Sequence, residues 1–244
     1  MATSVSSEVL ARGALTGWQV AVTGSSGGIG RVIASRLLAL DAVVHGVDRA
    51  PPTIEDSRFH PLSVDLANAA QASDAARALV HVDALVHAAG VLRVGRLGGL
   101  DHAAGDLMWR VHVDAATRLA DVLVPAMAKR GCGRVVFIGS RVAQGMPGRA
   151  QYAATKAALV ALARSWAREV VAKGVTVNVV APAATATPML ADRARAASAP
   201  RVPPLGRLID PAEIAELVCF LLSPAAAAIT GQDIAICGGA SLPS

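Results

Sequence analysis

The chain has 244 residues, of which 53% are hydrophobic and only 17% are charged, so it can form a large core and does not have the composition of a disordered protein. Its formal net charge is +5 at pH 7, but its 20 arginines and 3 lysines are spread along the sequence, which argues against a nucleic-acid partner. No apolar run approaches the roughly 18 residues of a membrane-spanning helix, so we expect no membrane partner.

Residues 1–15 are polar and rich in Ala and Ser, and they lack the apolar core of a signal peptide. We expect a short disordered lead over these residues and a single domain over residues 16–244. Cys132, Cys219 and Cys237 have no metal-type spacing, and the six histidines form no ligand cluster. The sequence therefore predicts a reduced, cytoplasmic protein without a metal ion.

A glycine-rich turn lies between the first strand and the first helix. Residues 18–23 form an apolar run typical of a buried strand, and residues 31–40 have the apolar spacing of a helix. Between them the glycines allow close backbone approach to a pyrophosphate, and the helix N-terminus offers N–H groups to it. The sequence thus predicts a dinucleotide cradle formed by Thr23, Gly24, Ser26, Gly28, Ile29 and Gly30.

An acidic residue follows the second predicted strand, residues 42–47. Asp48 lies 18 residues after Gly30, close to the roughly 20-residue offset of the carboxylate that binds a ribose 2′-hydroxyl. That carboxylate would repel a 2′-phosphate, so we expect NAD rather than NADP. Arg49 is the counter-argument, because a guanidinium there could accept the phosphate.

Strand-like and helix-like segments keep alternating along the chain, which predicts an α/β fold with a parallel sheet covered by helices on both faces. Two long predicted helices, residues 103–129 and 150–172, carry Ala and Leu on more than one face. A helix that is apolar all round needs a second partner, so we expect a homodimer or homotetramer.

Tyr152, the only tyrosine of the chain, stands four residues before Lys156 at the start of the second long helix. Residues i and i+4 share a helix face, so the phenol and the ammonium project into the same space. A nearby cation lowers the pKa of a phenol from its usual value of about 10. The pair is therefore a candidate proton donor and acceptor near neutral pH.

Together, the glycine turn and the Tyr-x-x-x-Lys pair resemble the short-chain dehydrogenase/reductase family, and the resemblance extends from about residue 16 to residue 240. It implies a Rossmann-type, doubly wound parallel sheet of about seven strands with helices on both faces. It also implies that Ser140 orients the substrate oxygen, that Lys156 holds the nicotinamide ribose and that Thr187 binds the carboxamide. Further cofactor residues implied by the matching segments are Asp65, Leu66, Ala88, Ala89, Gly90, Tyr152, Pro182 and Thr185.

The chain departs from the family pattern at several positions. His112 stands where the family has a fourth active-site residue, an asparagine, and His87 replaces the first asparagine of the Asn-Asn-Ala-Gly motif. A neutral imidazole at 112 could hold a water and shuttle protons, or it could be a packed helix residue. The interval from Ser140 to Tyr152 is one residue shorter than usual, and Ala183 and Cys237 replace a family glycine and aspartate.

The expected reaction is hydride transfer between NAD(H) and a small secondary alcohol or ketone, with Tyr152 as acid and base. One alternative is a dehydrogenase of a cyclohexadiene diol carboxylate, with Arg93 as the carboxylate ligand, and another is a 3-oxoacyl or polyketide-type ketoreductase using NADPH. A third is an NAD-binding regulator without turnover. Residues 187–208, rich in Pro and Arg, correspond to the family's lid over the substrate.

Overall fold

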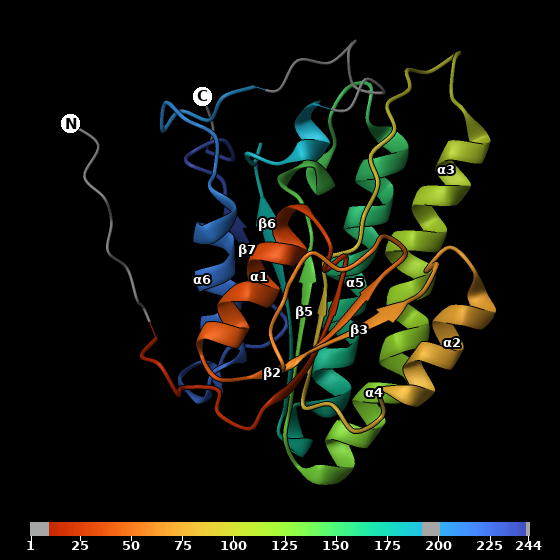
Figure 1. The fold of residues 1–244 in the computed structure, drawn as a ribbon. Helices are drawn as coiled ribbons and strands as arrows, with labels where there is room; N and C mark the ends of the chain where they lie inside the picture. The colour runs from red at the N-terminus through yellow and green to blue at the C-terminus, as the bar shows by residue number, and fades with distance from the viewer. Residues whose placement is uncertain (1–9, 192–200, 243–244) are drawn as a thin grey trace.

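The computed structural model describes residues 10–191 and 201–242, and it contains one parallel sheet between two layers of helices (Figure 1). The order of the seven strands is β3-β2-β1-β4-β5-β6-β7, and every neighbouring pair is parallel. The strands are β1 (Gln19–Thr23), β2 (Val43–Asp48), β3 (Phe59–Ser63), β4 (Ala84–His87), β5 (Gly133–Ile138), β6 (Val175–Pro182) and β7 (Asp233–Ile236). The predicted doubly wound Rossmann-type fold is confirmed.

Five of the six α-helices in the described residues cover the two faces of this sheet. Helices α1 and α6 pack on one face, and α2, α4 and α5 pack on the other (Figure 1). The helices are α1 (Gly28–Ala39), α2 (Ala69–Ala78), α3 (His102–Trp109), α4 (Ala115–Arg130), α5 (Ala150–Val170) and α6 (Pro211–Leu222).

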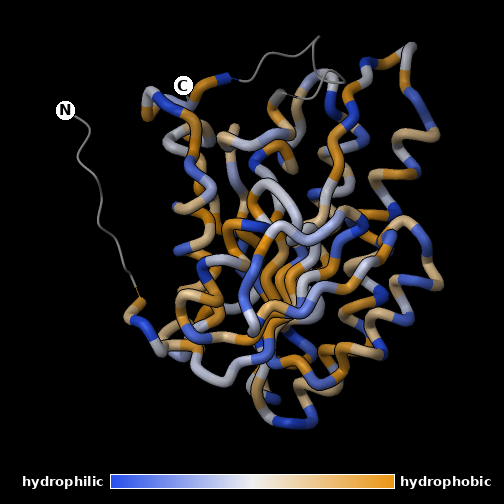
Figure 2. Tube along the Cα trace, in the orientation of Figure 1, coloured by the Kyte–Doolittle hydropathy of each residue, from blue (hydrophilic) through white to orange (hydrophobic). Residues whose placement is uncertain are grey.

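The central strands supply apolar side chains to both layers. On β5, Val136 and Ile138 pack toward α1 and α6, whereas Val135 and Phe137 pack toward α4 and α5. Successive side chains of a strand point to opposite faces, so a strand buried on both sides must be apolar throughout. Figure 2 shows these hydrophobic strands at the centre of the molecule.

The first helix begins earlier than the sequence predicts, at Gly28 rather than Arg31, and its N-cap residue is Gly27. The glycine turn therefore belongs in part to the helix, which brings the N-terminal N–H groups of α1 closer to the sheet edge. Asp48 is the last residue of β2 rather than the residue after it.

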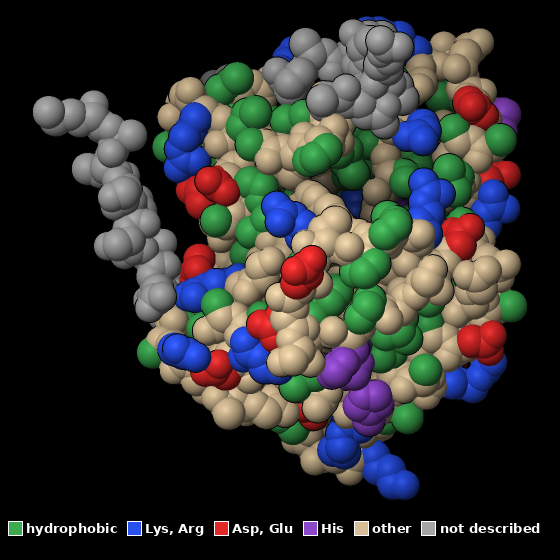
Figure 3. Space-filling model, in the orientation of Figure 1, with side chains coloured by type: hydrophobic (Ala, Val, Ile, Leu, Met, Phe, Trp, Pro, Cys, Tyr) green, Lys and Arg blue, Asp and Glu red, His purple; other side chains and the backbone are tan. Residues whose placement is uncertain are grey.

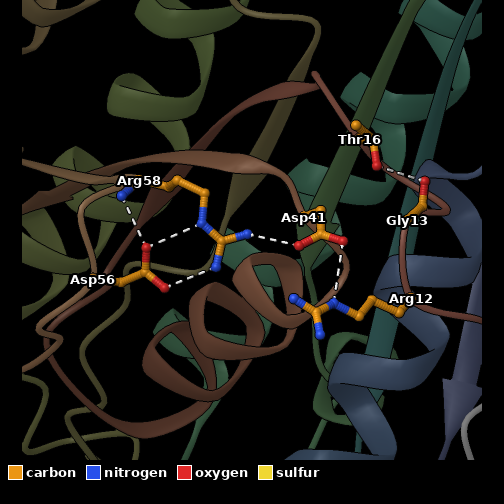
Figure 4. A network of polar contacts seen from close by, with 6 residues as sticks. All are labelled: Arg12, Gly13, Thr16, Asp41, Asp56 and Arg58. Atoms are coloured by element: carbon orange, nitrogen blue, oxygen red, sulfur yellow. Dashed lines mark hydrogen bonds and ion pairs between the residues drawn. The ribbon is translucent and has the colours of Figure 1, made fainter.

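The lead predicted over residues 1–15 is too long. Leu15 is fully buried in the core between the sheet and α1, and its N–H donates to Leu40 O at 3.2 Å. Figure 4 shows a further contact of this segment, in which Asp41 lies between Arg12 (3.4 Å) and Arg58 (3.0 Å). Residues 1–9 lie outside the described residues, so this part of the expectation stays a prediction.

The first long helix is interrupted. A π-helical turn, Arg110–Asp114, separates α3 from α4, and its three central residues are buried. Such turns insert one extra residue into a helix and occur often at functional sites. The sequence predicted one continuous helix here, because a π-turn leaves the apolar pattern largely intact. Its central residue is His112.

The surface shown in Figure 3 carries Lys and Arg side chains interspersed with Asp and Glu, without a basic stripe on this face. None of the helices in the described part of the chain is both long and apolar enough to span a membrane.

Candidate active site

Two adjoining cavities open at the carboxyl ends of the strands, the edge where open α/β sheets bind ligands. The larger measures about 720 Å³ and the smaller about 360 Å³. The two share the residues Ile29, Ala88, Gly90, Thr187 and Met189, so they form one continuous cleft. Most of the predicted site residues line it.

The smaller cavity has a floor that only glycines permit. Gly24 has φ +70°, and a β-carbon there would lie 2.8 Å from Ala89 Cα. A β-carbon at Gly30 would lie 2.2 Å from Gly24 O, so the first turn of α1 packs directly on the preceding backbone. No side chain caps α1, and its first N–H groups and partial positive charge face the cavity.

Asp48 is held in place at the far side of the same cavity. Its carboxylate accepts hydrogen bonds from the N–H groups of Ser26 and Ala50, both at 2.9 Å. Arg49 is exposed and lines the cavity as well. Asp65 and Leu66 lie on its wall, as predicted from the sequence.

Two predicted cofactor residues, Thr23 and Ser26, line neither cavity. Thr23 is fully buried, and its Oγ1 accepts from Ala89 N–H at 3.0 Å. Ser26 acts through its bond to Asp48 and through its hydroxyl, which donates to Ala50 O at 3.1 Å. Both residues therefore shape the cleft by holding neighbours that line it.

The larger cavity contains the three residues expected to carry the chemistry, Ser140, Tyr152 and Lys156. Ser140 follows β5 and caps a short 3₁₀ turn, where its Oγ accepts from Val142 N–H at 3.2 Å. Tyr152 and Lys156 lie on the first turns of α5, with Lys156 Nζ 5.8 Å from the centre of the phenol ring. The predicted shared helix face brings the two together.

Lys156 is 4% exposed, and its Nζ donates to Ile138 O at 2.8 Å. Burial lowers the pKa of Lys156 to about 7, because the ammonium loses its hydration. The lysine is therefore only partly charged at neutral pH in the free protein. The sequence predicted a cation beside the phenol but not its burial, since sequence spacing carries no information about burial.

His112 is fully buried, and both ring nitrogens are engaged. Nε2 accepts from Val91 N–H at 2.9 Å, so the proton must be on Nδ1, which donates to Thr155 Oγ1 at 2.8 Å. Thr155 in turn donates to Tyr152 O at 2.8 Å. Burial, followed by Lys156 and His87, lowers the pKa of His112 well below its usual value.

These contacts favour the packed-residue interpretation of His112 over the proton shuttle. Protonation of Nε2 would place two N–H donors against each other at Val91, and neither nitrogen is left to hold a water. The ring instead links the loop after β4 to the start of α5, close to Tyr152, whose ring centre is 5.6 Å away.

His87 is engaged in the same manner. Its Nε2 donates to Val111 O at 3.1 Å, and its Nδ1 accepts from Thr23 Oγ1 at 3.0 Å. Burial lowers the pKa of His87 to about 3, so it stays neutral. Both histidines belong to or contact the π-turn: His87 binds the carbonyl of Val111, and His112 is the residue that follows Val111.

We predict that His112→Ala lowers kcat about tenfold, because the two buried contacts that link the loop after β4 to the start of α5 are lost. His112→Asn should recover part of the loss, since an amide can replace one contact. The pH–rate profiles of wild type and His112→Asn should have the same shape between pH 5.5 and 8. His102→Asn, an exposed histidine of α3, is the matched control. A change of rate near pH 6.5 that is present in the wild-type profile and absent from that of His112→Asn would instead support a proton shuttle through His112.

Three further predicted cofactor residues line the larger cavity with Tyr152 and Lys156. They are Pro182, Thr185 and Thr187. Residues 192–200 of the predicted lid lie outside the described residues. Across residues 10–191 and 201–242, no group of three or more His, Cys, Asp or Glu side chains could hold a metal ion.

Sequence reasoning missed several residues of the larger cavity, among them Arg96, Arg141 and Arg149. The sequence could have indicated Arg141, because this residue directly follows Ser140. It could not have indicated Arg96, since the position of Arg96 depends on how the loop after β4 folds onto α5.

The chain is similar in sequence to known enzymes. Residues 24–241 match the family model described as enoyl-(acyl carrier protein) reductase. The chain is 38% identical over 232 residues to the 3-oxoacyl-(acyl-carrier-protein) reductase FabG of Salmonella typhimurium, which covers 89% of this chain and 95% of the relative. It is 36% identical over 239 residues to the reductase of the same name from Vibrio cholerae, which covers 92% of this chain and 98% of the relative.

Solved structures of related oxidoreductases have a similar fold. A protein from Beutenbergia cavernae, described as an NAD(P)-dependent gluconate 5-dehydrogenase with bound NADP at low occupancy, has a TM-score of 0.85 at 33% identity, covering 93% of this chain and 97% of the other. The 3-ketoacyl-(acyl-carrier-protein) reductase from Brucella melitensis complexed with NADH has a TM-score of 0.84 at 27% identity, covering 93% and 100%.

Proposed function

The chain belongs to the short-chain dehydrogenase/reductase family of oxidoreductases, and from this premise we propose that it reduces the ketone of a 3-oxoacyl group to a secondary alcohol with NADH. The observation that carries the proposal is the shared cleft, with Ser140, Tyr152 and Lys156 in one half and a glycine-floored cradle in the other. The sequence offered a 3-oxoacyl ketoreductase using NADPH only as an alternative to a broader NAD-dependent alcohol dehydrogenase. The FabG relatives favour the ketoreductase, whereas NADH is proposed here because of Asp48.

The smaller cavity fits a dinucleotide. Two of its glycines, Gly24 and Gly30, leave no room for a β-carbon, and the uncapped N-terminus of α1 suits a pyrophosphate. Asp48 would accept from the hydroxyls of the adenosine ribose, and Asp65 with Leu66 would border the adenine. Thr187, which lines both cavities, would lie where the nicotinamide half begins.

The chemistry divides between cofactor and chain. The nicotinamide, when bound, supplies the hydride. Tyr152 donates its phenolic proton to the carbonyl oxygen, and Ser140 donates a hydrogen bond that steadies the charge developing there. The charged form of Lys156 stabilises the phenolate left behind, which makes Tyr152 a stronger acid, and the phenolate regains its proton from solvent before the next turnover.

The preference for NADH rests on Asp48. Two backbone N–H groups fix its carboxylate, so it cannot swing away from a 2′-phosphate. The relatives do not decide the choice, because NADP accompanies the Beutenbergia protein and NADH the Brucella reductase. The fixed negative charge of Asp48 should influence the choice between NADH and NADPH more than the exposed Arg49 does, because the guanidinium of Arg49 is screened by solvent.

We predict that wild type has a kcat/KM for NADH at least about tenfold above that for NADPH, and that Asp48→Ala reverses or abolishes this ratio. The variant loses the repulsion of a phosphate and keeps Arg49. Asp48→Ala/Arg49→Ala is the matched control, in which the gain for NADPH should shrink. Steady-state rates with both cofactors provide the measurement, and a wild type that already prefers NADPH would overturn the assignment.

The diol carboxylate alternative gains no support at the residue that suggested it. Arg93 lines the smaller, cofactor-side cavity and not the larger one. The homo-oligomer, the cytoplasmic location and the single domain remain predictions.

The test of the proposed function is NADH oxidation with a 3-oxoacyl thioester, compared with oxidation of simple secondary alcohols by NAD. We expect the thioester to be the better substrate by kcat/KM. Faster turnover of the simple alcohols would favour the broader dehydrogenase, and tight NADH binding without turnover of either class would favour the regulator.

A further inference from the structure

Four arginines line the larger cavity around Ser140, Tyr152 and Lys156. They are Arg96, Arg141, Arg149 and Arg201. None of the described residues that line this cavity is Asp or Glu. A cavity whose described lining carries this much positive charge and no carboxylate attracts anions, because its low-dielectric walls focus the field.

The arginines reach the cavity from separate segments of the chain. Arg96 lies in the loop after β4, which is fixed to the start of α5 by a bond from Gly95 N–H to Gly148 O at 3.0 Å. A β-carbon at Gly148 would lie 3.9 Å from Cγ of Arg96, so the stem of that arginine crosses the turn that precedes α5. This turn ends three residues before Tyr152.

Arg141 reaches the cavity from a different segment. It follows Ser140 directly, and its Nε donates to Ala240 O at 3.2 Å, which ties the side chain to the C-terminal turn. A guanidinium has five N–H donors in a planar fork that suits a carboxylate or a phosphate, and this bond uses one of them. Arg141 is half-buried, so its charge is less screened than that of an exposed arginine.

We propose that the substrate carries an anionic group, a carboxylate or a phosphate, which Arg141 binds in the larger cavity while Arg96 adds to the attraction. The proposal rests on the ketone reduction proposed above, and it narrows the substrate class to acidic 3-oxoacyl compounds. Arg141 is then a specificity-determining residue, since it contacts the substrate away from the reacting carbonyl.

Four substrates with the same six-carbon 3-oxoacyl chain separate the sources of the charge. The neutral reference is 3-oxohexanoyl-N-acetylcysteamine. Its three anionic counterparts are 3-oxohexanoyl-pantetheine 4′-phosphate, 3-oxoadipoyl-N-acetylcysteamine and 3-oxohexanoate, which carry a phosphate on the thiol side, a carboxylate at the end of the acyl chain and a free carboxylate in place of the thioester.

We expect at least one anionic substrate to have a kcat/KM about 10- to 100-fold above the neutral reference, and the ratio to fall by a similar factor in Arg141→Gln. The ratio should also fall as salt is raised. Arg141→Lys should keep part of it, because the charge remains but the fork is lost. Arg77→Gln is the matched control, since it removes an exposed arginine of α2 outside both cavities.

The outcomes distinguish this inference from the proposed function. Equal kcat/KM for all four substrates, or an equal ratio in wild type and Arg141→Gln, would refute the anionic substrate and leave the ketone reduction intact. Reduction of none of the four would refute the proposed function. In that case, binding of 3-oxohexanoate to the enzyme–NADH complex, followed by NADH fluorescence, decides the inference: it should weaken about 10-fold or more in Arg141→Gln, and unchanged affinity would refute it.

Discussion

Tyr152→Phe is expected to lower kcat by about 10²- to 10⁴-fold, the usual contribution of a positioned general acid. The variant keeps the ring that packs 5.6 Å from His112 and removes only the hydroxyl that gives its proton to the carbonyl oxygen. The chain has no second tyrosine to take over this role. The measurement is the single-turnover rate of ketone reduction with saturating NADH.

The control for this variant is cofactor binding. The Kd of NADH from fluorescence titration should stay within a few-fold of wild type, because the cradle between Gly24 and Gly30 is untouched. A variant that still turns over at a near-normal rate would show that another group supplies the proton. A variant that loses NADH binding as well would show a structural defect instead of a chemical one.

Lys156→Met is expected to reduce kcat by a comparable factor, since the phenolate of Tyr152 loses the adjacent cation.

The same variant tests the burial of the lysine through the pH dependence of the free energy of unfolding. In the unfolded chain the amine titrates near its ordinary value of 10.5, whereas burial lowers its pKa to about 7 in the folded protein. Between these two values the unfolded chain binds more protons than the folded one.

The free energy of unfolding of the wild type therefore rises with pH across this window, and below about pH 7 the folded protein bears the full cost of a buried ammonium. Relative to Lys156→Met, we expect the wild type to gain on the order of a few kcal/mol between pH 7 and pH 10. Denaturant unfolding at a series of pH values measures the difference, in which the titration of the cysteines cancels. Parallel curves for the two proteins would mean that Lys156 is hydrated.

Local sequence patterns were sufficient for much of the fold and of the site. The strand–glycine turn–helix unit, the carboxylate at the end of β2 and the Tyr152–Lys156 spacing each depend on a few neighbouring residues. Their geometry follows from helix and strand periodicity and from the small size of glycine. These same units specify a parallel sheet, whose carboxyl edge is the place for a ligand.

The sequence by itself thus determined the Rossmann-type fold and the residues that could do redox chemistry. Only the tertiary structure decided that Lys156 is buried with a pKa near 7, that Leu15 belongs to the core and that both nitrogens of His112 are engaged. It also placed four arginines from separate segments around one cavity. The physical reason is that burial, tautomer and local charge depend on contacts between residues far apart in the chain, and such contacts leave no periodic signal in the sequence.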